Sequence, residues 1–218
     1  KSYKNMSEEI IKFKVLKIFG PQIIKTRIPK IIIESMNNYT LEVLNNQKKS
    51  KELDAGNTLA GNVTQEFLLE ESWIKNSGWL NFLYSLSNDV MKILLKKEIK
   101  QFNITSSWIV RQFQNEYNPL HNHSGHLSGV GYLKVPSNFG DTIQKKDAFR
   151  NKNGQITFAH GSKQFLCDAT IDIIPEVGDL YLFPSYLLHA VNPYYNSSEE
   201  RRSVSFNAIV DENISQNV

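Results

Sequence analysis

The sequence contains little that would mark a secreted or membrane protein. Cys167 is the single cysteine among 218 residues, so no disulfide can form within the chain. A chain without disulfides suits a reducing compartment. No apolar run approaches the roughly 20 residues of a membrane-spanning helix, and the first residues lack the pattern of a signal peptide. We therefore expect a cytoplasmic protein with no membrane partner.

Excess charge of one sign is also scarce. The formal net charge is +3, and lysines are scattered in short stretches such as Lys96-Lys97 and Lys145-Lys146. Nucleic-acid binding would need basic residues concentrated in a stripe, so a nucleic-acid partner is not expected. Hydrophobic residues make up 40% and charged residues 22% of the chain, which is ordinary for a globular protein. The length suits one domain, residues 1–218.

The first part of this domain, residues 1–100, has mainly helical patterns. Apolar residues recur at helical spacing in 31–44 and again in 79–99. The stretch 45–62 is rich in Asn, Lys, Ser and Gly, which favours an exposed loop. Before the first helix, residues 13–28 alternate apolar and polar side chains around a Gly-Pro pair, which predicts a bent or broken strand.

The second part, residues 101–212, changes to a strand pattern. Short apolar runs predict strands at 108–110, 127–135, 155–159, 169–174, 180–183 and 204–210. Turn-forming residues separate these runs, and many short strands of this kind predict a sandwich or a small barrel. The polar stretch 137–153 is expected to be a mobile insert. Helices gathered ahead of the strands indicate an α+β fold in which the helices support one face of the sheet.

A pair of histidines precedes one of the predicted strands. His121 and His123 are separated by one residue, so on an extended chain both imidazoles point the same way and could reach one metal ion. Such a pair is also common beside surface turns, and alone it leaves both interpretations open. His189, shortly after the predicted strand 180–183, is available as a third ligand and favours a metal site.

The last predicted strand has an unusual polar face. Strand alternation places on one side Arg201, Ser203, Ser205 and Asn207, and on the other side mainly apolar residues. A polar face led by arginine suits a cavity that holds a carboxylate ligand, because a guanidinium binds carboxylate through two parallel hydrogen bonds and stays charged when buried. An ordinary solvent-exposed face explains the same pattern equally well.

Taken in order, these motifs resemble the 2-oxoglutarate/Fe(II) oxygenase superfamily, and most of all a microbial and phage branch similar to prolyl hydroxylases. Four motifs carry the resemblance: His121-x-His123, the run SGVGYL at 128–133, Phe183-Pro184-Ser185 with His189, and Arg201-x-Ser203. Together they cover about half the chain, residues 108–210. The resemblance implies a double-stranded β-helix, which is a jelly-roll or cupin-like barrel, with N-terminal supporting helices. A phage origin would place the protein in the host cytoplasm.

The resemblance also implies roles for individual residues. His121 and His189 match the two histidine ligands of the iron. Contacts to the cosubstrate 2-oxoglutarate are expected from Arg201, Ser203, Tyr132 and Asn207. Arg201 matches the residue that anchors the distal carboxylate, whereas Asn207 is suggested by its strand position alone.

One position departs from the family pattern. His123 stands where the family has an aspartate, so the expected ligand set is three imidazoles. It lacks the carboxylate that would lower the net charge of the Fe(II) centre. His126, three residues further on, is expected to lie outside the ligand set.

The activity implied by the resemblance is that of a dioxygenase, which uses Fe(II), 2-oxoglutarate and O₂ to hydroxylate a C–H bond. A peptide or prolyl side chain is the leading candidate substrate, and a small molecule is the other. Two alternatives stay open. A cupin-type dioxygenase also binds iron through three histidines and needs no 2-oxoglutarate, and a non-catalytic binding module could retain the same barrel. The motif Arg201-x-Ser203 favours the 2-oxoglutarate enzyme.

Overall fold

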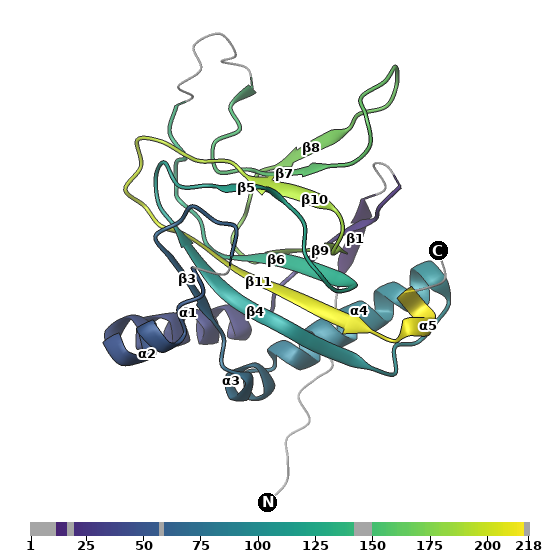
Figure 1. Ribbon diagram of the computed structural model, residues 1–218, viewed down its shortest axis with the longest axis horizontal. Coiled ribbons are helices and arrows are strands. Elements are labelled where there is room, and N and C mark those ends of the chain that lie inside the picture. Colours follow the sequence, from purple (N-terminus) through teal and green to yellow (C-terminus); the bar gives the residue numbers. More distant parts are fainter. Residues whose placement is uncertain (1–11, 17–19, 57–58, 142–149, 216–218) are drawn as a thin grey trace, which may run out of the picture.

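Figure 1 shows the computed structural model of the protein, which describes residues 12–16, 20–56, 59–141 and 150–215. In these ranges the strands form two sheets, and all neighbouring strands are antiparallel. The seven strands of the major sheet have the order β1 (Phe13–Leu16), β2 (Ile23–Arg27), β9 (Asp179–Pro184), β6 (Leu127–Lys134), β11 (Arg201–Val210), β4 (Phe102–Gln112) and β3 (Gln65–Leu68). The four strands of the minor sheet have the order β5 (Asn118–His121), β10 (Leu188–Val191), β7 (Ile156–Ala159) and β8 (Thr170–Ile173).

Helices cover one face of the major sheet, and the minor sheet lies over the other face (Figure 1). The described helices are α1 (Lys30–Asn45), α2 (Gln47–Glu52), α3 (Glu71–Asn76), α4 (Trp79–Leu95) and α5 (Glu212–Ser215). The chain therefore has an α+β fold with antiparallel sheets. None of the described helices is long and apolar enough to cross a membrane.

The hydrophobic core between the helices and the major sheet depends on alternation in β11. Val204 and Phe206 are fully buried against the helices, and the Phe206 ring meets Trp79 of α4 edge-on at a centroid distance of 6.0 Å. Gly129 of β6 lies opposite Phe206, and a Cβ there would come within 2.3 Å of the Phe206 ring. Glycine is therefore needed at this position for the ring to pack. Burial of each such side chain stabilises the fold by roughly 2 kcal/mol.

A second core cluster lies between the two sheets. It combines Tyr132, Tyr181 and Phe183 of the major sheet with Ile156 and Phe158 of the minor sheet. We call the face of the major sheet that is turned toward the minor sheet its inner face. The part of the inner face formed by β6 and β9 packs apolar and aromatic side chains against the minor sheet. The candidate site lies on the rest of this inner face, which combines polar side chains such as Arg201 with apolar ones such as Trp108.

The structure confirms the main sequence predictions of secondary structure. The helices expected at 31–44 and 79–99 are α1 and α4, and α4 ends early because Lys96 adopts a left-handed conformation with φ 58°. The six predicted strands are present in the strands β4, β6, β7, β8, β9 and β11.

Other parts of the fold differ from the expectation. The first hundred residues supply three strands of the major sheet as well as helices, and the predicted bent strand at 13–28 is an antiparallel pair, β1 and β2. The predicted loop at 45–62 contains α2, which begins because the Asn46 side chain accepts a hydrogen bond from the backbone N–H of Lys49 at 3.0 Å. Residues 142–149 of the expected mobile insert lie outside the described residues.

Candidate metal centre

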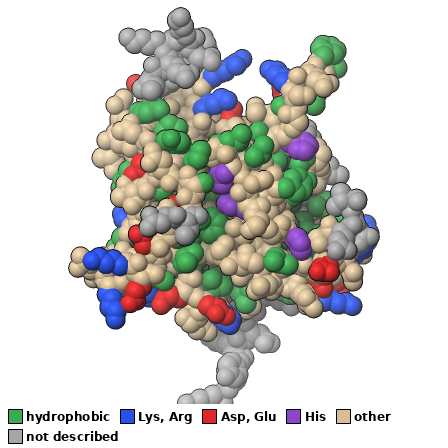
Figure 2. All heavy atoms as spheres, viewed as in Figure 1, with side chains coloured by type: hydrophobic (Ala, Val, Ile, Leu, Met, Phe, Trp, Pro, Cys, Tyr) green, Lys and Arg blue, Asp and Glu red, His purple; other side chains and the backbone are tan. Residues whose placement is uncertain are grey.

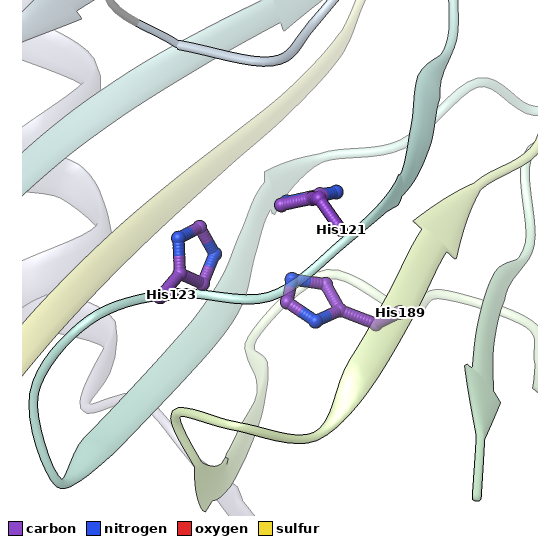
Figure 3. Close-up of side chains that lie close together, drawn as sticks. All are labelled: His121, His123 and His189. Atoms are coloured by element: carbon purple, nitrogen blue, oxygen red, sulfur yellow. The ribbon is translucent and has the colours of Figure 1, made fainter.

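Three histidines converge between the two sheets (Figure 3). His121 ends β5, and it lies directly opposite His189 of β10 in the antiparallel register, so both rings are on the same face of the minor sheet. His123 follows β5 by two residues. One nitrogen from each ring lies within 4.8 Å of the others. The ring centroids are 4.3 Å apart for His121 and His189, 4.9 Å for His121 and His123, and 5.0 Å for His123 and His189.

Backbone carbonyls orient two of the three rings. Nδ1 of His121 lies 2.6 Å from the carbonyl oxygen of Pro119, and Nδ1 of His189 lies 2.9 Å from that of Leu187. A carbonyl only accepts, so Nδ1 carries the hydrogen and the Nε2 lone pair is left for a metal ion. His123 is held by its backbone, whose N–H donates to the carbonyl of Ser185 at 2.9 Å.

The electrostatics favour neutral imidazoles. Burial lowers the pKa of His123 to about 4 and that of His189 to about 3, and the neighbouring His121 adds to both effects. Neutral rings are the form that binds metal, and a set of three imidazoles suits Fe, Zn, Cu or Ni. Histidine side chains are visible in the middle of the face in Figure 2. The residues present therefore fit a transition-metal ion.

The histidines share a pocket with β11. Its described lining consists of Trp108, Val110, Asn118, His121, His123, Val130, Ile156, His189, Val191, Arg201, Ser203 and Ser205. Within that lining there is no acidic residue. The carboxylate that would accompany two histidines in the family pattern is thus replaced by the third ring, that of His123.

Arg201 is the only cationic side chain in this described lining, and only 2% of it is exposed. Its Nη1 donates to the carbonyl of Gly154 at 3.2 Å, and its carbon Cζ lies 5.3 Å from the ring centre of Tyr132. Among described residues its Nε has no hydrogen-bond partner, and the same holds for the Tyr132 hydroxyl. Burial raises the pKa of Tyr132 to about 12, which keeps the phenol protonated. Burial lowers the pKa of Arg201, but a guanidinium is basic enough to stay charged in a protein interior. An unpaired buried guanidinium is costly and calls for an anionic partner.

The other predicted residues differ in their placement. Ser203 lines the pocket and lies opposite Tyr132 of β6 in the register. Tyr132 itself is outside the described lining and contacts it through Arg201. Asn207 was expected to contact the cosubstrate, but it is not part of the described lining. Its amide is bonded to Ser128 and Ser106 instead. His126 lies outside the histidine cluster, as expected, and its Nδ1 accepts from the backbone N–H of Val210 at 3.1 Å.

Sequence reasoning missed several residues of the site. The ring of Trp108 lies 5.6 Å from that of His123, and Phe158 and Phe183 pack against His189. The strand containing Trp108 was predicted, and its alternation would have placed Trp108 and Val110 on one face. No sequence signal identified Asn118, because the short strand β5 resembled a turn.

Comparison with known proteins agrees with this site. Residues 106–207 match the model of a family described as "Putative 2OG-Fe(II) oxygenase". A search of curated proteins found no match. Among solved structures, a prolyl-4-hydroxylase from Pseudomonas putida is 15% identical, with a TM-score of 0.58, over 86% of this chain and 91% of that one.

Two further solved structures have similar folds. HygX from Streptomyces hygroscopicus, with nickel, 2-oxoglutarate and hygromycin B bound, is 12% identical with a TM-score of 0.53, over 88% of this chain and 83% of that one. A prolyl hydroxylase from Trichoplax adhaerens, in complex with a peptide fragment of the hypoxia inducible factor oxygen degradation domain, is 14% identical with a TM-score of 0.53, over 94% and 86%. Just under half of the chain, residues 106–207, thus matches a family of 2-oxoglutarate/Fe(II) oxygenases, which are enzymes with Fe(II) and 2-oxoglutarate as cofactors, and the solved structures agree in fold.

Proposed function

We propose that this chain is a dioxygenase that couples the oxidation of 2-oxoglutarate by O₂ to hydroxylation of a C–H bond in a second substrate. His121, His123 and His189 bind the Fe(II), and Arg201, Ser203 and Tyr132 bind the distal carboxylate of 2-oxoglutarate. Residues 1–218 form one oxygenase domain whose sheets make up a double-stranded β-helix. One observation supports this most directly: the unpaired, buried Arg201 shares a pocket with the three histidines.

The chain's own residues then have distinct tasks. The imidazoles of His121 and His189 stay in place because their Nδ1 atoms are bonded to backbone carbonyls. Arg201 provides the charge that a carboxylate needs in a buried site, and its free Nε is a donor for it. The Tyr132 hydroxyl is a second free donor beside the guanidinium. When bound, iron and 2-oxoglutarate supply the oxidising chemistry, with succinate and CO₂ as the by-products.

We infer that the substrate is a peptide with a prolyl side chain. The support is that two of the similar folds are prolyl hydroxylases, one of them in complex with a peptide. A small molecule is the alternative, because HygX, with the same fold, binds hygromycin B.

A second candidate function is a three-histidine dioxygenase that does not use 2-oxoglutarate. The absence of a carboxylate from the described pocket lining favours it. Such an enzyme would have no use for Arg201 as an anion-binding group, and this difference separates the two functions experimentally.

The test is 2-oxoglutarate turnover by protein loaded with Fe(II) under anaerobic conditions and then exposed to O₂. We expect succinate to form at a slow rate without substrate and faster with a prolyl peptide, and His189→Ala to abolish it. Oxygen consumption without succinate would favour the second candidate. Failure of the metal-loaded protein to bind 2-oxoglutarate would contradict the proposed function.

A further inference from the structure

His123 is held differently from the other two histidines. Its ring makes no hydrogen bond within the described part of the chain, whereas His121 and His189 each bond a backbone carbonyl. Its position therefore depends on the segment 122–126 that carries it. Three backbone bonds fix this segment: His123 N–H to Ser185 O at 2.9 Å, Ser185 N–H to His126 O at 3.1 Å, and His126 N–H to Ala208 O at 2.9 Å.

A row of polar side chains crosses the inner face of the major sheet beside this segment. Asn207 of β11 lies directly opposite Ser106 of β4 on one side and Ser128 of β6 on the other. Side chains paired across strands in this way lie on one face and contact each other. Asn207 Nδ2 donates to Ser106 Oγ at 3.2 Å, and Asn207 Oδ1 lies 2.7 Å from Ser128 Oγ. Ser128 Oγ also lies 2.9 Å from Ser185 Oγ.

The direction of these bonds follows from the atoms. The amide oxygen of Asn207 can only accept, so the single hydroxyl hydrogen of Ser128 points to it. Ser185 must then donate its hydroxyl hydrogen to Ser128. The result is a directed chain from Ser185 through Ser128 to Asn207 and on to Ser106. Its terminal residue, Ser185, bonds the backbone of both His123 and His126.

Three of the four members of this chain are buried, Ser106 is partly buried, and none of them belongs to the described pocket lining. Ser128 and Ser185 are each 1% exposed and Asn207 is 8% exposed. Buried polar groups usually satisfy each other because an unpaired one costs roughly 1–3 kcal/mol. A fully bonded network also restricts its members to a single arrangement. At the Asn207 end, the register with β4 shifts between Asn207 and Ala208, so an irregularity in the sheet accompanies the row.

We propose that the row formed by Ser106, Asn207, Ser128 and Ser185 positions His123 as the third metal ligand. This inference rests on the proposed function. The row acts through the backbone of segment 122–126, so its members are positioning residues that touch neither metal nor substrate. They give His123 the fixed placement that the rings of His121 and His189 receive from the backbone carbonyls of Pro119 and Leu187.

The test measures Co(II) affinity and the visible absorption of the Co(II)-loaded protein in Ser128→Ala and Asn207→Leu variants. Loss of groups that orient a metal ligand typically weakens metal binding about 10- to 100-fold. We expect about tenfold weaker Co(II) binding and an altered ligand-field spectrum, since one imidazole would be displaced. Ser128→Thr, which keeps the hydroxyl, should restore affinity and spectrum.

Ser107→Ala is the matched control. Ser107 is 2% exposed, lies next to Ser106 in β4, and its hydroxyl is bonded to Ser205 O and Trp79 Nε1 on the helix side. We expect it to lower the melting temperature as Ser128→Ala does, yet to bind Co(II) like the wild type. If Ser128→Ala does not fold, Ser185→Ala provides the same measurement from the other end of the row.

The outcomes separate this inference from the proposed function. If the wild type binds no Co(II), or if His189→Ala binds it unchanged, the metal centre itself is wrong. If the wild type binds Co(II) and His189→Ala does not, while the row variants match the wild type in affinity and spectrum, only the positioning role is overturned. Equal weakening by Ser107→Ala would also overturn it, because it would indicate a general loss of stability.

Discussion

The two arginines that begin β11 are neighbours in the chain, but their surroundings are opposite. Both are buried, Arg201 at 2% and Arg202 at 6% exposed. Arg202, on the helix side, donates two hydrogen bonds to Glu200, at 2.8 and 2.9 Å, and one to Asn37 of α1 at 2.9 Å. Arg201, on the pocket side, has no carboxylate partner among the described residues and bonds only the carbonyl of Gly154.

Two buried glutamates repeat this contrast. Burial would raise the pKa of Glu200, but hydrogen bonds from Arg202 and Arg111 outweigh it and lower the pKa to about 2. Glu66 of β3 is opposite Val110, a residue of the pocket lining, and so shares the inner face. Within the described part of the chain neither of its oxygens makes a well-formed hydrogen bond, although the Asn118 side chain lies close enough to oppose the rise of its pKa. Burial, with a further contribution from Asp54, raises the pKa of Glu66 to about 7.

The difference between these charged pairs indicates which face of the major sheet binds the ligand. The fold can satisfy buried charge, because on the helix side Glu200 forms ion pairs with both Arg202 and Arg111. On the inner face, Arg201, Tyr132 and Glu66 keep unbonded polar atoms, whereas on the helix side the unbonded Oγ of Ser87 belongs to a neutral hydroxyl. Buried polar groups without partners are rare, and they cluster where a protein meets its ligand. We therefore expect substitutions on the helix side to change stability and substitutions on the inner face to change ligand binding.

The largest effect is expected from Arg202→Met. The substitution removes two charge-assisted hydrogen bonds to buried Glu200 and leaves Arg111 to pair with it, which should lower the free energy of unfolding by about 3 kcal/mol or more. Arg201→Met in ligand-free protein removes a charge that has no partner, and the free energy of unfolding should stay equal or rise. Urea denaturation of both variants measures the comparison. Equal losses in the two variants would contradict the contrast between the faces.

In the second prediction, which concerns ligand binding, Arg201 matters more than Arg202. Arg201→Met should weaken 2-oxoglutarate binding on the order of 100-fold, equivalent to about 3 kcal/mol, because the ligand loses its buried cation. Arg201→Lys keeps the positive charge but cannot bind a carboxylate in a bidentate manner, so its affinity for 2-oxoglutarate should lie between those of the wild type and Arg201→Met. Arg202→Met should bind 2-oxoglutarate like the wild type. Calorimetric titration of anaerobic, metal-loaded protein measures all three, and an unchanged affinity in Arg201→Met would remove Arg201 from the site.

The sequence predicted one face of β11 better than the other. Alternation grouped Arg201, Ser203 and Ser205, and the structure places all three in one pocket lining. It also grouped Asn207 with them, yet Asn207 is bonded within the sheet. Parity assigns a residue to a face but not to a position along that face, and only the register with β4 and β6 shows that Asn207 pairs with serines.

The contrast between the arginines was not predictable from the sequence. Glu200 precedes Arg202 by two residues, but the sequence does not show that this carboxylate turns to the helix side and pairs with Arg111. The cluster of three histidines was easier to predict from the sequence. The spacing of His121 and His123 is local, and only His189 required a pairing distant in sequence, that of β5 with β10.

The third prediction concerns the buried carboxyl group of Glu66. The folded-state pKa of Glu66 is raised to about 7 from an ordinary value of 4.5, so its neutral form is favoured by folding. The associated stability is complete below about pH 4.5 and is lost as the pH rises through about 7. Glu66→Gln should remove this loss and exceed the wild type by about 3 kcal/mol at pH 8, with a smaller difference at pH 5.

Glu200 gives the opposite slope and serves as the control. Its folded-state pKa of about 2 lies below the ordinary value, so its stability is present above about pH 4.5 and lost as the pH falls toward 2. The acid limb of the stability curve should therefore persist in Glu66→Gln. Urea denaturation across this pH range measures both limbs. If Glu66→Gln were parallel to the wild type at all pH values, Glu66 would be ionised in the folded protein.

The smallest effect is expected from Tyr132→Phe, which removes only the unbonded hydroxyl of a fully buried ring. In ligand-free protein this hydroxyl has no partner among the described residues, so its loss should leave stability equal or slightly higher. In the complex it should cost one hydrogen bond to the carboxylate, about 1 kcal/mol, which is roughly a fivefold weaker affinity for 2-oxoglutarate. Tyr181→Phe is the matched control, because its ring is also buried but its hydroxyl is already bonded to Asp179 at 3.2 Å. Tyr181→Phe should lose stability and keep its affinity for 2-oxoglutarate. If Tyr132→Phe behaved in the same way, the Tyr132 hydroxyl would not bind the carboxylate.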